Sequence, residues 1–172
     1  MNVTGLDKAL SNARRALLAE RGADGYWIGE LSTSALSTAT AVIALNEVDP
    51  TLHRALIEGG VRWLVDNQNA DGGWGDTTVS FSNISTTLLC WSALGATSTS
   101  VGTQRGEELA EQWVRAYVGS LEPSAIARAV AARYGKDRTF SVPILMTCAL
   151  CGRLGEGAGA WRRVLPLPFE LA

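Results

Sequence analysis

The chain alternates between two kinds of helical segment, amphipathic ones and ones that are apolar on nearly every side. Residues 4–20 and 50–67 place apolar side chains along one stripe at helical spacing, with charged side chains elsewhere. Residues 35–46 and 84–94 carry almost no polar side chains beyond Ser and Thr, so we expect those helices to be buried on all sides. This order predicts helical hairpins, each with an amphipathic outer helix and an apolar inner helix.

Two landmarks in these segments recur at nearly the same interval. The tetrapeptide Asp-Gly-Tyr-Trp at 24–27 returns as Asp-Gly-Gly-Trp at 71–74, 47 positions later. The tripeptide Leu-Ser-Thr at 36–38 returns as Ile-Ser-Thr at 84–86, 48 positions later. A period in the forties is typical of arrays of helical hairpins. We therefore predict two repeats, about 4–46 and 49–95.

A third, degenerate repeat follows at about 104–153. Its outer helix is predicted over 107–118 and its inner helix over 141–150, with an inserted Ala-rich helix at 123–134. Residues 154–172 form a Gly/Pro-rich tail, in which the Gly-rich stretch 155–159 is predicted to be a loop. The predicted fold is all-α, a single domain over 1–172 that forms a partial α/α toroid of about three hairpins.

Composition excludes several classes of protein. The chain has 172 residues, of which 47% are hydrophobic and 19% charged, which favours a folded domain over disorder or a coiled coil. Its net charge is -2 and it has no basic stripe, so no nucleic-acid partner is expected. No apolar run approaches the roughly 20 residues of a membrane span. The N-terminus has no signal pattern, and we expect a cytoplasmic location.

Residues able to bind metals or act as nucleophiles are few. Cys148 and Cys151 form a C-x-x-C pair, but no strand-to-helix turn precedes it and no further zinc ligands lie nearby. Together with Cys90 they are predicted to be core thiols. The single histidine, His53, is predicted to be a solvated surface residue rather than a general base. The sequence thus implies no metal and no cofactor.

The segment from Trp63 to Trp74 carries a specific motif, Trp-Leu-x-x-x-Gln-x-x-x-Gly-x-Trp, with Gln68 and Gly72 at its centre. It resembles the glutamine-tryptophan repeat of the squalene-hopene and oxidosqualene cyclases. In that family the Gln amide covers the Trp indole and satisfies the open ends of neighbouring helices, a combination that suits these residue types. We interpret these residues as a structural brace rather than a ligand site.

The first copy of the motif departs from the family pattern, because Arg21 stands in the position of the Gln, ahead of Gly25 and Trp27. A guanidinium is also planar and can stack, so the brace is predicted to persist in altered form. Further stretches resemble bacterial members of the same family, and these are residues 25–31, 136–141 and 165–170.

The resemblance also implies what this chain does not contain. Family members are several times longer, with two α/α-barrel domains around an apolar cavity, and they protonate an alkene or epoxide with an Asp-x-Asp-Asp motif. None of the seven aspartates lies closer than five positions to another, so that motif is absent and no catalytic residue is predicted. The segment resembles the N-terminal part of the cyclase, mostly the first half of the second barrel.

Other polar residues admit two interpretations. Phe140, Pro143 and Thr147 are the candidates for a cavity-lining face, because the family's helix at this place faces the polyene, but core packing is the competing interpretation. Glu30 and Asp76 are interpreted as helix caps rather than chemical groups. The segment 136–138, Lys-Asp-Arg, is interpreted as a salt-linked loop rather than a pyrophosphate clamp.

Three functions follow from these patterns. The first is scaffold and cavity wall of a class II terpene (triterpene) cyclase acting on squalene-like isoprenoids, inactive without the remainder of a longer chain. The second is a standalone isoprenoid-binding or lipid-binding module or an assembly partner, for which a second copy would cover the open edges. The third resembles a protein prenyltransferase β-subunit, and it is disfavoured because that role needs a zinc site of Asp, Cys and His. Membrane association, at the inner face, is expected only for the parent enzyme.

Overall fold

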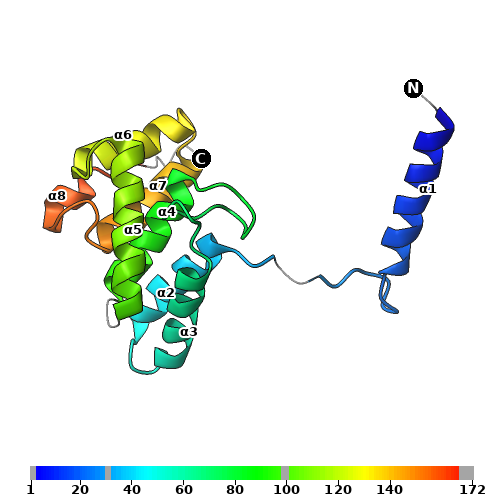
Figure 1. Ribbon diagram of the computed structural model, residues 1–172, viewed down its shortest axis with the longest axis horizontal. Coiled ribbons are helices and arrows are strands. Elements are labelled where there is room, and N and C mark those ends of the chain that lie inside the picture. Colours follow the sequence, from blue (N-terminus) through cyan, green and yellow to red (C-terminus); the bar gives the residue numbers. More distant parts are fainter. Residues whose placement is uncertain (1–2, 30–31, 98–100, 167–172) are drawn as a thin grey trace. The chain divides into compact units, whose positions relative to one another are not determined.

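The computed structural model describes residues 3–29, 32–97 and 101–166, and these residues form helices and turns without a strand (Figure 1). The all-α prediction is confirmed. None of the described helices combines the length and hydrophobicity needed to cross a bilayer. The helices are α1 (Val3–Ala19), α2 (Ala35–Val48), α3 (Arg54–Asp66), α4 (Ile84–Ala96), α5 (Val101–Val118), α6 (Pro123–Tyr134), α7 (Arg138–Leu150) and α8 (Gly157–Trp161).

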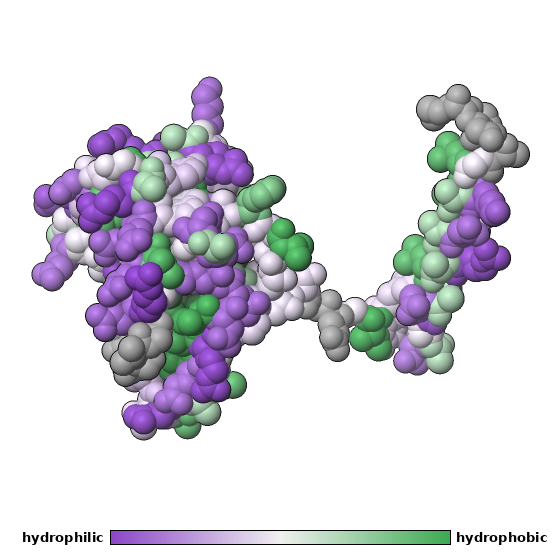
Figure 2. Space-filling model, in the orientation of Figure 1, coloured by the Kyte–Doolittle hydropathy of each residue, from purple (hydrophilic) through white to green (hydrophobic). Residues whose placement is uncertain are grey.

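The chain divides into two compact units, residues 1–32 and residues 33–172. The first unit contains α1 and the turn that follows it. Leu6, Leu10 and Leu17 of α1 are all more than half exposed, and Figure 2 shows the apolar side chains along one side of this helix. The single-domain organisation and the partial α/α toroid stay predictions.

Helix α4 is the centre of the second unit. Every residue from Ile84 to Leu94 is buried, because α2, α5 and α7 all pack against it. The amphipathic helices form the other layer, with α3 on α2, α5 on α4 and α6 on α7. This arrangement places an apolar helix inside and amphipathic helices outside, as the hydrophobic pattern predicts for this part of the chain.

Helix α2 corrects one expectation. The hydrophobic pattern of residues 35–46 predicts burial on all sides, but Leu36 is 39% exposed and Ala41 and Ala44 are exposed as well. Only one stripe, which includes Ala39 and Val42, is buried. The physical reason is that α3 and α4 are the helices packed against α2 in this unit, and they cover one side of it.

Several helix ends also differ from the predicted ones. The Asp49 carboxylate accepts hydrogen bonds from the N–H groups of Thr51 and Leu52, which closes a separate turn before α3 begins at Arg54. Helix α7 begins before Ser141, because Asp137 caps the N–H of Thr139. Helix α5 begins at Val101 rather than 107, and α4 continues one residue past Gly95.

The prediction of a loop over the Gly-rich stretch 155–159 is wrong for its second half. Helix α8 runs over Gly157–Trp161, and its Ala160 is 1% exposed. Burial of this small side chain and of Leu154 fixes the segment against the core, which outweighs the low helix propensity of glycine. The glycine count alone could not reveal that contact.

Candidate functional site

The turn between α3 and α4 is closed by its own backbone. The Asn69 N–H donates to the Gly73 carbonyl and the Gly72 N–H donates to the Asn69 carbonyl, both at 2.9 Å. Gly72 has a φ of +90°, and a Cβ there would lie 2.6 Å from the Leu109 carbonyl oxygen on α5. A side chain is therefore excluded twice, by the backbone conformation and by the neighbouring helix.

Trp74 lies beneath this turn and is 1% exposed. Its Nε1 donates to the Leu64 carbonyl at 2.9 Å, and its backbone N–H donates to Thr87 Oγ1 at 3.0 Å. Leu64 is in the last turn of α3, where carbonyl groups lack helical partners. The indole thus satisfies the end of α3, while Thr87 connects the turn to α4.

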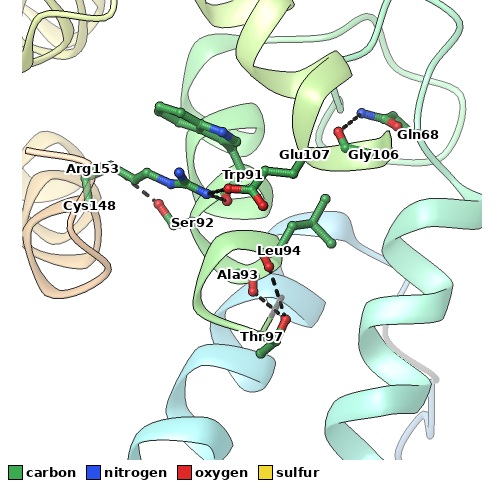
Figure 3. Close-up of polar contacts among 10 residues, drawn as sticks. All are labelled: Gln68, Trp91, Ser92, Ala93, Leu94, Thr97, Gly106, Glu107, Cys148 and Arg153. Carbon is green, nitrogen blue, oxygen red and sulfur yellow. Dashed lines mark hydrogen bonds and ion pairs between the residues drawn. The ribbon is translucent and has the colours of Figure 1, made fainter. Parts of the chain in front are cut away.

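Gln68 connects the same turn to the following outer helix. Its Nε2 donates to the Gly72 carbonyl at 2.8 Å and to the Gly106 carbonyl on α5 at 2.9 Å, the second bond being drawn in Figure 3. Trp63, the first residue of the motif, is half-buried on α3 and packs against the core. One amide group therefore fixes α3, the turn and α5 together.

Asp71 adds a second connection to α5, one that the motif does not indicate. Its carboxylate accepts from Ser82 Oγ at 2.7 Å, from the Gly73 N–H at 3.0 Å and from Trp113 Nε1 at 3.1 Å. Burial raises the pKa of Asp71, but these hydrogen bonds to the charged form outweigh it, and the pKa is lowered overall. The Asp before a Gly-Gly pair indicates a turn, but its bond to Trp113, 42 positions away, has no local signal.

The turn in the first unit has the same construction. Trp27 Nε1 donates to the Leu17 carbonyl at 2.6 Å, Arg21 Nε donates to the Gly25 carbonyl at 2.6 Å, and Gly25 has a φ of +83°. The Arg21 guanidinium lies 5.7 Å from the Trp27 ring centroid. Each of these two hydrogen bonds has its counterpart 47 positions later, so Arg21 here makes the bond to the turn carbonyl that Gln68 makes in the second repeat.

The face of α7 that carries the cavity candidates is open. Phe140 is 59% exposed, Pro143 is exposed and Thr147 is half-buried, at a spacing that places them on one side of the helix. Met146 and Leu150 are also about half exposed. The other side is buried, and it consists of Ser141, Val142, Ile144, Leu145, Cys148 and Ala149. Whether the open face lines a cavity stays a prediction.

Of the other candidate polar groups, Asp76 holds the start of a helix. The Asp76 carboxylate accepts from Asn83 Nδ2 and Thr86 Oγ1, both at 2.8 Å, at the start of α4. His53 is half-buried in the position before α3 and makes no capping bond there. Arg138 donates to the Pro166 carbonyl at 3.0 Å. Glu30 lies outside the described residues.

The thiols are poorly ionised. Burial raises the pKa of Cys148 to about 12 and that of Cys151 to about 11, and it raises the pKa of Cys90 as well. Ser92 Oγ lies 3.9 Å from the Cys148 sulfur. Within the described ranges, no group of three or more His, Cys, Asp or Glu side chains could hold a metal ion.

Comparison with known proteins places these features in context. The model of the squalene-hopene cyclase N-terminal domain matches residues 10–145. A dammaradiene synthase from Dryopteris crassirhizoma is 35% identical over 74 residues, which cover 37% of this chain and 11% of that protein. The matched segment therefore spans about a tenth of the length of this curated relative. The resemblance drawn from the Gln-Gly-Trp motif is confirmed by the family match.

Proposed function

This chain belongs to the family of squalene-hopene cyclase N-terminal domains, and on that premise we propose that it is the N-terminal part of a class II terpene cyclase. The substrate would be a squalene-like isoprenoid, cyclised through carbocations. This chain would contribute the scaffold and part of the cavity wall. The family match over 10–145 is the observation that carries the proposal.

The open face of α7 has the chemistry that such a wall requires. A carbocation is quenched by water and by nucleophilic side chains, so its surroundings have to be apolar and dry. Phe140, Pro143 and Leu150 present carbon surfaces at this face. Thr147 also carries a hydroxyl group on this face, and that hydroxyl donates a hydrogen bond to the Pro143 carbonyl at 2.9 Å. An aromatic ring such as Phe140 also stabilises a nearby cation through its π-face.

The acid that starts the reaction is proposed to lie elsewhere in the longer protein. Protonating an alkene needs a carboxyl group that stays protonated until it reacts. Asp49 and Asp71 have the opposite property. Hydrogen bonds from the backbone N–H groups of Leu52 and Thr51 lower the pKa of Asp49, and at Asp71 burial raises the pKa but hydrogen bonds from Ser82, Gly73 and Trp113 lower it overall. Because this sequence has no Asp-x-Asp-Asp motif, the chain alone is expected to be catalytically silent.

The test begins with the coding sequence that follows residue 172. The full-length protein is purified, incubated with squalene and with shorter linear isoprenoids, and the extract is analysed by gas chromatography and mass spectrometry. We expect a cyclic product from the full-length protein and none from the 172-residue chain. The proposal is refuted if a full-length protein containing an Asp-x-Asp-Asp motif yields no cyclic product, or if the chain alone cyclises squalene.

A second function is supported by the exposed apolar edges. Leu36 and Val48 on α2, and Met146 and Leu150 on α7, are between 39% and 77% exposed, and surfaces of this kind mark binding sites. A standalone isoprenoid-binding or assembly module, paired with a second copy, would cover them. Light scattering that shows a dimer, together with saturable squalene binding by the chain, would favour this function. In either case we propose a cytoplasmic location, with peripheral membrane contact for the parent enzyme.

A further inference from the structure

The end of α7 is held by a side chain that plays no part in the repeat motif. Arg153 lies against the Trp91 ring of α4, with its guanidinium carbon 4.0 Å from the ring centroid. Its Nη2 donates to the Trp91 carbonyl at 2.6 Å and to Glu107 Oε1 of α5 at 2.5 Å (Figure 3). We call Arg153, Trp91 and Glu107 the arginine clamp. It joins three helices through one planar group.

The backbone brings Arg153 to this place through the way α7 ends. Gly152 has a φ of +75°, its N–H donates to the Ala149 carbonyl, and the Arg153 N–H donates to the Cys148 carbonyl at 2.8 Å. This is the Schellman arrangement, which reverses the chain directly after a helix. Arg153 is thus rigidly connected to the last turn of α7, so fixing its side chain also fixes the helix.

The ion pair in the clamp is better shielded from water than the other pairs. The Arg153 and Glu107 side chains are 16% and 23% exposed, whereas those of Arg105–Glu108 and Arg115–Glu111 are between 43% and 66% exposed. Exposed pairs are worth little because water screens them and their side chains stay free to move. The Arg153 guanidinium, by contrast, is shielded from water and stacked on Trp91, so it is held in one geometry.

Helix α4 is also shaped to receive the guanidinium. Gly95 lies inside α4, and a Cβ there would overlap the Arg153 guanidinium and come within 2.9 Å of Glu107 Oε1. Glycine inside a helix is less stable than alanine. Glycine at position 95 thus lowers the stability of α4, but it leaves room for the Arg153 guanidinium between α4 and α5.

We propose that Arg153 is a positioning residue, which sets the rotation and axial position of α7 on α4 and α5 and thereby the shape of the face carrying Phe140, Pro143 and Thr147. The inference rests on the proposed function. Cyclisation through carbocations passes through several cationic intermediates. Each intermediate can lose a proton or close a further ring, depending on how the cavity wall holds the isoprenoid. The ratio of products therefore reports the position of that wall.

The experiment uses the full-length protein with Arg153→Lys and Gly95→Ala. Lysine keeps the charge but cannot stack as a plane, and alanine displaces the guanidinium from the opposite side while favouring the α4 helix. Arg115→Lys, at an exposed pair on α5, is the matched control. Product ratio, kcat, KM and the melting temperature are measured for each variant.

We expect both variants, and not the control, to shift the ratio of fully to partly cyclised products in the same direction by at least about threefold, within the 10²-fold that a roughly 1 Å displacement can cost. We expect kcat to fall more than KM changes. A lowered melting temperature with an unchanged product ratio in both variants would overturn the inference, because Arg153 would then be only a stabilising residue.

A second measurement separates this inference from the proposed function. In the 172-residue chain, hydrogen exchange of the α7 amides is compared between wild type, Arg153→Lys and Arg115→Lys. Faster exchange confined to α7 in Arg153→Lys would show that the clamp restrains this helix, which the positioning role requires, even if the full-length protein cyclises nothing, an outcome that would refute the proposed function alone. Unchanged exchange along α7 overturns the positioning role.

Discussion

The two buried tryptophans of the second unit allow the brace to be measured by a matched pair of substitutions. Trp74 is 1% exposed and donates its indole N–H to the Leu64 carbonyl, whereas Trp91 is 5% exposed and its indole N–H has no partner among the described residues. Replacing either with phenylalanine removes a similar volume from the core. Phenylalanine at position 91 keeps an aromatic face for the Arg153 guanidinium, so the two variants differ chiefly in one hydrogen bond.

The expected loss in free energy of unfolding depends on whether a substitution leaves a buried polar group without a hydrogen-bond partner. Trp74→Phe leaves the Leu64 carbonyl buried without its partner, and an unsatisfied buried group costs about 1–3 kcal/mol. Trp91→Phe removes an N–H group that already lacks a partner, so it has no such penalty. We expect the free energy of unfolding to fall by about 1–3 kcal/mol more in Trp74→Phe than in Trp91→Phe.

The assay is urea unfolding of the 172-residue chain, followed by circular dichroism at 222 nm, with free energies extrapolated to zero denaturant. The comparison requires equal m-values, because a changed m-value would report a change in compactness rather than in stability. Equal losses in the two variants, within about 0.5 kcal/mol, would refute the reasoning. The hydrogen bond from the indole would then contribute nothing to the brace.

Three further predictions concern the same region. Gln68→Ala loses both amide hydrogen bonds and should destabilise the chain by about 1–3 kcal/mol in urea unfolding, whereas Gln112→Ala, exposed on α5, should change stability by less than about 0.5 kcal/mol. Because the pKa of Asp71 lies below its ordinary value of 3.8, the stabilisation by its carboxylate is present above that value and is lost as pH falls through the folded pKa. The difference in free energy of unfolding between wild type and Asp71→Asn should therefore shrink as pH is lowered from about 5 to about 3, and a constant difference would contradict this. With pKa values of about 11 and 12, Cys151 and Cys148 should alkylate at least about a hundredfold more slowly in the native chain than in urea, which mass spectrometry of iodoacetamide adducts checks.

Sequence reasoning works best here where a contact is local. Gln68, Gly72 and Trp74 all lie in one turn next to the end of α3. The whole motif therefore occupies a short segment of the sequence, and this segment occurs twice. The same locality explains why the repeat interval alone assigns Arg21 to the position of Gln68. Apolar periodicity likewise predicts the existence of most helices, since α-helical spacing depends only on neighbours in the chain.

Contacts between distant segments are where the same reasoning stops. Nothing near Asp71 indicates Trp113, and nothing near Arg153 indicates Trp91, 62 positions earlier in the chain. The exposure of α2 has the same origin, because the number of helices that cover an apolar helix is a property of the assembly and not of that helix. In the sequence, the clamp is marked by Gly95 within α4. The local pattern around this glycine predicts the end of a helix instead.

Local contacts within a turn and long-range contacts between helices have different roles in this structure. The turn contacts shape each hairpin, and the long-range contacts place one helix against others. The paired bonds of Arg21 and Gln68 close each turn in the same way, so they specify a hairpin that any repeat could share. The segment predicted to be a third repeat has no such turn motif between α5 and α7. Helix α7 is held instead by Arg153, through contacts that the two turns described above do not have. A helix that is fixed by its own clamp can take a position that the turn motif does not specify. That helix is α7, which carries the face proposed to contact the substrate.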